Sequence, residues 1–148
     1  MKNSNIVERR TSFTENKTIA QLWLQLISEG NIEAICSMTS PTWRMHGGAP
    51  NMPEGPDGIR YLFSTFDHID QQWTVDMVFA EGDYVTVRAT NSCMQSSFLG
   101  IPAAGIRQVF TCTFIFHIVD GMMVETWRNA DDLGRVLQLG VKLTPSES

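Results

Sequence analysis

The clearest structural signal in the chain lies in residues 108–128, QVFTCTFIFHIVDGMMVETWR. Two apolar segments are joined there by Asp120-Gly121, a dipeptide that favours the tight turn of a β-hairpin. We therefore predict a long strand over Gln108–Val119, rich in Phe, Thr and Ile, and a partner strand over Met122–Arg128. A sheet with at least one long hairpin must then organise the C-terminal half of the fold.

Further strands are predicted before this hairpin. The segment that begins at Trp73 alternates between apolar and polar residues, and so does Tyr84–Cys93 after the turn Glu81-Gly82-Asp83. The second strand has two distinct faces: one carries Val85, Val87 and Ala89, and the other carries Tyr84, Thr86, Arg88 and Thr90. Glycine and proline predict a loop over Leu99–Gly105. These strands extend the hairpin into a larger antiparallel sheet.

The N-terminal half is predicted to be mostly helical. Apolar residues at helical spacing indicate three helices, over Glu15–Glu29, Ile32–Met38 and Asp57–Asp67. A short strand over Thr42–His46 and a loop over Gly47–Gly55 are expected between the second and third. A last helix is predicted over residues 131–139.

This order of elements predicts an α+β fold. The helices are expected to pack inside a curved antiparallel or mixed sheet, which encloses a cone, and a short helix follows the last strand. We predict a single domain over residues 14–141, a flexible arm over 1–13 and a tail over 142–148. A cone of this kind supplies a buried pocket for a small molecule.

Composition narrows the function. The chain has 148 residues, 43% of them hydrophobic, and a net charge of −5 from 11 basic and 16 acidic residues, which argues against nucleic-acid binding. No apolar stretch is long enough to cross a membrane. The widely spaced Cys36, Cys93 and Cys112 favour reduced thiols and a cytoplasmic location. Neither a metal site nor a cofactor motif is expected. The expected partner is a small hydrophobic substrate, because the cone supplies an apolar pocket.

The string Ile118–Trp127, followed by Asp131-Asp132-Leu133-Gly134, resembles the C-terminal half of SnoaL-like polyketide cyclases. Shorter matches extend this resemblance: Gln138–Gly140, Val87-Arg88, Phe98–Pro102 with Gly105, and Gly55–Arg60. The resemblance implies an NTF2-like fold, a cone of helices and a bent sheet. It also implies a small cofactor-free enzyme of a natural-product pathway, of a kind that closes rings by aldol chemistry, opens epoxides or takes part in hydroxylation.

The sequence departs from the catalytic residues that the resemblance implies. The acid/base carboxylate of the aldol cyclases falls at Arg128, or at Asn129 with a shift of one residue, and the accompanying histidine falls at Phe114. The arginine of the epoxide hydrolases matches Arg88, but their two aspartates fall at Thr90 and Asn129. The classical acid/base pair is therefore not retained.

Four polar residues are candidate catalytic residues. Arg88 and Asn129 could hold a developing oxyanion, while His46 or Asp131 moves the proton. Each has a structural alternative: an ion pair of Arg88 with Glu125 or Asp131, capping of the last helix by Asn129 or Asp131, and a loop position without a task for His46.

The candidate substrate-binding residues are mostly aromatic, and each could equally belong to the core. They are Trp43, Phe63, Thr90, Phe114 and Trp127. Asp132 is expected to be solvated, and His117 is expected on the outer face of the sheet.

The predicted function is a cofactor-free cyclase or isomerase that closes or rearranges a polyketide or terpenoid intermediate in an apolar pocket. The alternatives are a non-catalytic binding or scaffold module and an auxiliary in epoxide opening or hydroxylation. A homodimer is also expected, through a sheet face that carries Val85, Val87 and Ala89.

Overall fold

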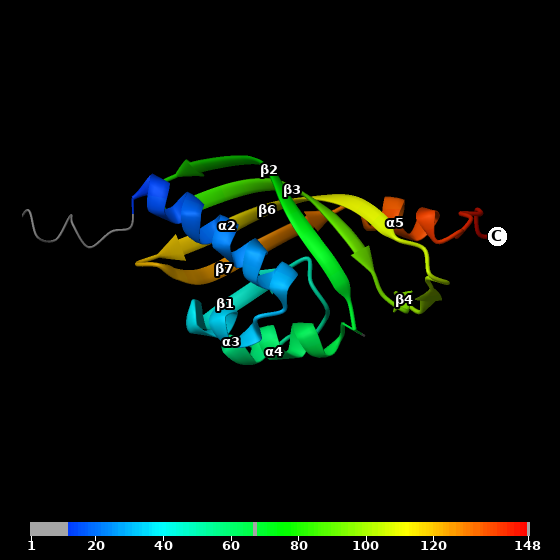
Figure 1. The fold of residues 1–148 in the computed structure, drawn as a ribbon, viewed down its shortest axis with the longest axis horizontal. Coiled ribbons are helices and arrows are strands. Elements are labelled where there is room, and N and C mark those ends of the chain that lie inside the picture. The colour runs from blue at the N-terminus through cyan, green and yellow to red at the C-terminus, as the bar shows by residue number, and fades with distance from the viewer. Residues whose placement is uncertain (1–11, 67, 148) are drawn as a thin grey trace, which may run out of the picture.

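The computed structural model describes residues 12–66 and 68–147. Its helices are α2 Phe13–Glu29, α3 Ile32–Ser37, α4 Pro56–Ser64 and α5 Asp132–Gln138. Its strands are β1 Thr39–His46, β2 Asp70–Glu81, β3 Tyr84–Met94, β4 Ser97–Phe98, β5 Ile101–Pro102, β6 Gln108–Val119 and β7 Met122–Ala130. Helices α2, α3 and α4 lie on the same side of a curved sheet, and α5 lies with β4 at one end of the molecule (Figure 1).

The main sheet has five strands in the order β1-β7-β6-β3-β2. Its pairs are antiparallel except for β1, which lies at the edge and runs parallel to β7. The short strands β4 and β5 form a separate hairpin; β5 lies within the segment predicted as a loop, and β4 lies just before it. The predicted α+β fold with a mixed, curved sheet is confirmed.

The core lies between the concave face of the sheet and α2. Val85, Val87 and Ala89 of β3 are fully buried there, in one cluster with Trp23 and Leu24 of α2. The prediction that this face of β3 is exposed and pairs with a second copy is therefore wrong. Alternation separates the two faces of a strand, and burial of the apolar face beneath the helices leaves the polar face outside the cone.

Helix α2 begins earlier than predicted because a polar residue caps it. The Ser12 hydroxyl accepts a hydrogen bond from the backbone N–H of Glu15 at 3.1 Å, and the helix starts at Phe13. Gly30 ends the helix in the left-handed conformation, as its position predicts. The rest of the predicted arm lies outside the described residues.

Other boundaries shift by a few residues. Strand β1 starts at Thr39 and runs through Pro41, which an edge strand tolerates because one side of it needs no hydrogen-bond donor. Helix α4 ends at Ser64, and Asp67 lies outside the described residues. Residues 142–147 form neither helix nor strand.

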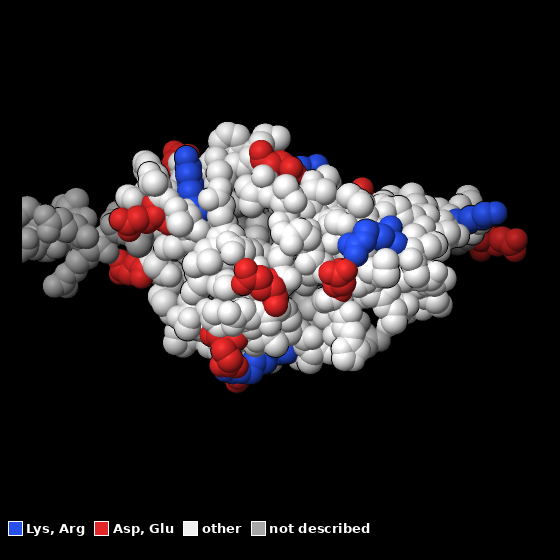
Figure 2. Space-filling model, in the orientation of Figure 1, with Lys and Arg blue, Asp and Glu red and all other residues white. Residues whose placement is uncertain are grey.

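None of the helices in the described part of the chain is long and apolar enough to span a membrane. On the face of the molecule that carries the helices, acidic and basic side chains are scattered rather than gathered into one patch (Figure 2).

Candidate active site

Aromatic side chains form a floor on the concave face of the sheet. Phe110 and Phe114 lie on the same face of β6, both almost fully buried. Trp73 of β2 packs edge-on against both rings, with centroid distances of 5.7 Å and 5.1 Å. Phe63 of α4 is partly buried against the same core. Phe114 and Phe63, both predicted to bind substrate, therefore lie on the inner side of the cone, where an apolar wall is available.

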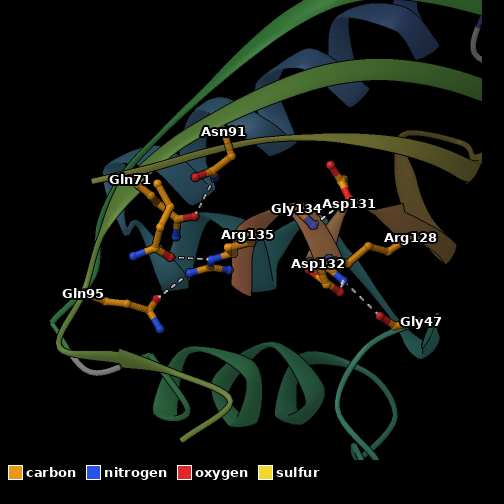
Figure 3. A network of polar contacts seen from close by, with 10 residues as sticks. Gly47, Gln71, Asn91, Gln95, Arg128, Asp131, Asp132, Gly134 and Arg135 are labelled. Carbon is orange, nitrogen blue, oxygen red and sulfur yellow. Dashed lines mark hydrogen bonds and ion pairs between the residues drawn. The ribbon is translucent and has the colours of Figure 1, made fainter. Parts of the chain in front are cut away.

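An ion pair lies beside this floor. Arg128 stands opposite Phe114 in the register of β7 with β6, so its side chain points to the concave face. Its Nη1 and Nη2 atoms donate to the Asp132 carboxylate oxygens, each at 2.9 Å (Figure 3). The side chains are 18% and 38% exposed, so the Asp132 carboxylate stays within reach of a ligand.

The surroundings hold Arg128 in its charged form. Burial lowers the pKa of its guanidinium, but hydrogen bonds and the negative charge of Asp132 raise the pKa by more, so the net shift is upward. Three of its five N–H groups donate hydrogen bonds: both on Nη1, to Asp132 and the Gly47 carbonyl, and one on Nη2, to Asp132. The N–H on Nε and the second N–H on Nη2 have no partner among the described residues. Arg128 therefore offers a fixed positive charge to an oxyanion.

Gly47 is required by the close approach of β1 to β7. Its φ is +79°, and a Cβ atom at this position would lie 2.1 Å from the backbone oxygen of Arg128. The glycine after His46 therefore lets the ends of the two parallel strands meet behind the ion pair.

A second polar cluster lies further along the concave face. Arg135 of α5 donates from Nε to Gln108 Oε1 at 2.8 Å and from Nη2 to Gln95 Oε1 at 3.0 Å. Beyond it, Asn91 Nδ2 donates to Gln71 Oε1 at 3.2 Å (Figure 3). The aromatic floor is thus bordered by two arginines, and one of them is paired with a carboxylate.

Three more of the predicted site residues on the sheet, Arg88, Thr90 and Asn129, lie on its convex face. Arg88 donates to Thr113 Oγ1 at 3.1 Å, and Thr90 donates to Asp76 at 2.7 Å. Neither side chain enters the cone, and Asn129 is exposed on the same convex face as Thr113. The expected grouping of Arg88 with Thr86 and Thr90 inside a dry pocket is wrong, for the reason given for β3.

His46 and Trp127 form a separate group on the convex face. The His46 ring stacks on Trp127 with a centroid distance of 5.1 Å, and its Nε2 lies 2.5 Å from Glu125. His117 lies on the outer face as predicted, stacked on Tyr84. Glu125 therefore binds His46, and the alternative considered for Arg88, an ion pair with Glu125, is absent from the described residues.

Two further candidate residues, Trp43 and Asp131, stabilise the fold and do not line the proposed site. Trp43 is buried in the core, where its Nε1 donates to Thr126 Oγ1 at 3.1 Å. Asp131 is exposed and caps α5, accepting the Gly134 N–H at 2.8 Å. The capping alternative for Asp131 is thus the observed geometry, and the neighbouring Asp132, predicted to be solvated, is the carboxylate that faces the site.

Two hollows lie apart from the ion pair, and the first shares Trp73 with the aromatic floor. One of about 380 Å³ lies between α2 and β2 and is lined by Gln21, Ser28 and Trp73 among others. The other, of about 670 Å³, lies on the convex face and is lined by Phe79, Ala80, Glu81, Tyr84, Thr86, Ile115 and Trp127. Neither contains the Arg128–Asp132 pair.

Comparison with known proteins gives one family. A family model described as SnoaL-like polyketide cyclase matches residues 17–139. TsrD from Streptomyces laurentii is 30% identical over 88% of this chain and 98% of its own, with a TM-score of 0.74. No curated protein matches the sequence.

More distant structures share the fold alone. AclR from Streptomyces galilaeus is 22% identical over 90% of this chain and 87% of its own, with a TM-score of 0.75. An LEH-like epoxide hydrolase from M. tuberculosis is 14% identical over 86% of this chain and 90% of its own, with a TM-score of 0.70.

Proposed function

Because the chain belongs to the family of SnoaL-like polyketide cyclases, we propose that it is a cofactor-free cyclase or isomerase that acts on the concave face of its sheet. The observation that carries this proposal is the Arg128–Asp132 pair beside Phe114. Arg128 occupies the place where the resemblance puts the carboxylate of the aldol cyclases, and Asp132 brings a carboxylate to the same place from α5.

The chemistry needs only one proton-transferring group. Asp132 removes the proton of a C–H bond next to a carbonyl, and the resulting enolate oxygen is held by the free N–H donors of Arg128. The enolate carbon attacks a second carbonyl of the same molecule, a C–C bond forms, and the new alkoxide takes the proton back from Asp132. No atom is gained or lost, so the reaction is an isomerisation that closes a ring.

The aromatic floor contributes by shaping the substrate. Trp73, which is only partly buried, offers a flat apolar surface against which a flexible polyketide or terpenoid chain folds, and the nearly buried Phe110 and Phe114 hold its ring in place. Holding the two reacting carbons together is itself a large part of the rate increase in an intramolecular reaction.

The first step can be tested with a simple aromatic ketone. We expect the protein to accelerate exchange of the α-protons of 1-tetralone in D₂O, followed by ¹H NMR. The Asp132→Asn variant should exchange about 100-fold more slowly, the low end of what a positioned general base contributes. Asp131→Asn, whose amide still caps α5, is the matched control. Equal rates for wild type and Asp132→Asn contradict the proposal.

A second candidate is a non-catalytic module that binds or presents a small molecule. The observation that favours it is the loss of the expected catalytic residues. The resemblance puts a histidine at Phe114 and an acid at Arg128, and neither residue can act as that group. Saturable binding of 1-tetralone without any increase in exchange would support this function over the enzyme.

We also propose that the chain forms a homodimer through the convex face. Met77, Phe79, Tyr84 and Ile115 are large exposed hydrophobic residues there, and Phe79 is 62% exposed. Together with the hollow beside Trp127 they make an apolar area on the face of the sheet that none of the described helices covers. An isologous dimer buries such an area against its own copy.

A cytoplasmic location is proposed as well. All three cysteines are free and buried, which suits a reducing compartment. Immunodetection of the tagged protein in cell fractions tests this location.

A further inference from the structure

Arg135 is a buried cation that makes no ion pair with any residue the structure describes. Its residue exposure is 5%, and burial lowers the pKa of its guanidinium. Among the residues that the structure describes, no carboxylate lies within 4 Å of it. The nearest acid in the sequence, Asp132, places both of its oxygens on Arg128. A buried charge of this kind is costly unless another group neutralises it.

The protein orients this guanidinium without neutralising it. Gln108 and Gln95 accept two of its five N–H donors, and the Phe98 ring lies 3.6 Å from its central carbon. Three donors, on Nη1 and Nη2, have no partner among residues 12–66 and 68–147. The arginine is therefore fixed in place with one edge of its fork unused.

A second observation points to the same place. Gln71 is 8% exposed, and its Nε2 makes no hydrogen bond within the described part of the chain. Gln71, Cys93 and Gln108 are neighbours across β2, β3 and β6, so the Gln71 amide lies on the strands that hold Arg135 (Figure 3). Asn91, which is 1% exposed, donates a hydrogen bond to the Gln71 oxygen and makes none with the Gln71 nitrogen. A buried amide without a partner is costly unless a ligand supplies an acceptor.

We propose that Arg135 and Gln71 form a subsite for a carboxylate of the substrate. A carboxylate accepts two parallel hydrogen bonds from the free edge of a guanidinium, and its remaining lone pairs accept from the Gln71 amide. Phe110, which lies 4.8 Å from the Arg135 guanidinium, leads from this subsite to the aromatic floor.

This proposal rests on the proposed function, and it specifies the class of substrate that the enzyme accepts. Asp132 and Arg135 are three residues apart on α5 and share a helix face. A substrate whose carboxylate binds Arg135 therefore extends over Phe110 towards Phe114, and its reactive carbonyl region meets Asp132 and Arg128. The substrate is an aromatic or polyene acid with ketone groups some distance from the carboxylate.

Binding of benzoate and benzamide tests the subsite, since the two probes have the same shape and differ in charge. By NMR titration we expect wild type to bind benzoate about tenfold more tightly than benzamide. Arg135→Gln should abolish this preference, and Gln71→Leu should reduce it. Arg107→Gln, which removes an exposed arginine near the same end of the sheet, should keep it. Equal affinity of wild type for both probes, or no benzoate binding at millimolar concentration, overturns the proposal.

The same variants separate this proposal from the proposed function. Asp132→Asn should retain the benzoate preference while it loses the exchange of 1-tetralone, a neutral ketone. If Arg135→Gln fails to fold, Arg135→Lys is the second variant. It keeps the positive charge and should preserve a weaker preference for benzoate over benzamide. If Arg135 only holds the β4–β5 hairpin, all variants bind the two probes equally, and the subsite is refuted while the exchange result stands.

Discussion

Arg128 and Asp132 form a two-pronged ion pair that ties the end of β7 to the first turn of α5, with both N–O distances at 2.9 Å. The pair fixes the direction in which α5 leaves the sheet, and α5 also carries Arg135. The geometry of the ion pair thus determines where both ends of the proposed site lie.

Breaking the ion pair should destabilise the fold moderately. Arg128→Met removes the cation and leaves a partly exposed carboxylate, so we expect a loss of about 1–2 kcal/mol in the free energy of unfolding. Urea denaturation followed by tryptophan fluorescence measures this loss. The Arg128→Met/Asp132→Asn double variant should be less destabilised than the sum of its single variants, and strict additivity would argue against the pair.

Gly47→Ala should disturb the site through the backbone. The new Cβ would meet the Arg128 oxygen, so we expect a loss of stability above the roughly 1 kcal/mol of left-handed strain, together with slower exchange of 1-tetralone. Gly82→Ala is the matched control, because Gly82 also has a positive φ but a Cβ atom added there would meet nothing within 4 Å. Identical effects of the two substitutions would show that the close approach is unimportant.

Asp131 should matter for stability and not for chemistry. Asp131→Ala removes the acceptor of the Gly134 N–H and should cost about 1 kcal/mol, while Asp131→Asn should be nearly neutral. Thermal unfolding of both variants beside wild type measures the difference. A loss of exchange activity in a fully folded Asp131→Asn protein would return Asp131 to the catalytic group.

Stability should fall in alkali because of a buried thiol. Burial raises the pKa of Cys112 from 9.0 to about 11, so folding favours the neutral thiol. The stabilisation from this shift is complete below pH 9 and is lost as the pH rises from 9 to 11, by at most about 2 kcal/mol. Urea unfolding at pH 7.5 and pH 10.5 with reductant present should show a smaller decrease for Cys112→Ala than for wild type.

The proposed dimer can be tested by measuring the mass of the protein in solution. Phe79→Glu places a charge in the apolar area of the convex face and should convert a dimer into a folded monomer, as read by light scattering after gel filtration. Leu99→Glu changes an even more exposed apolar residue, between β4 and β5, and should leave the dimer intact. A wild-type protein of monomeric mass contradicts the dimer directly.

The strands and their turns were predictable because their signals are local. The alternation of Tyr84–Cys93 and the turn at Asp120-Gly121 depend on neighbours in the sequence, and the structure has both. Which face of β3 is covered depends on where α2 packs, some 60 residues earlier in the chain, as Val85 and Arg88 illustrate. Arg88, Thr90 and Asn129 were therefore expected inside the cone and lie on its convex face, although the strands that carry them were predicted correctly.

The residues that line the site lacked a distinctive local signal. The first of two adjacent acids at a helix start is the expected cap, and Asp131 has that role, but no local signal marks Asp132 as the acid that faces the concave side. The spacing of Arg128 and Asp132, four residues apart, was the one available clue to their pairing. Arg135 and Gln71 look like ordinary polar residues, and only the meeting of α5 with β2 and β6 isolates them from solvent.

The parallel pairing of β1 with β7 has a consequence for how the chain matures during synthesis. Strand β1 is made early, yet its sole neighbour in the main sheet is the last strand to leave the ribosome. The N-terminal helices must therefore wait, with one strand edge open, until about residue 130 has emerged. Closure of this long-range pair brings Gly47 against Arg128, so the step that completes the sheet also assembles the proposed site, and nascent chains that end before Arg128 lack this contact.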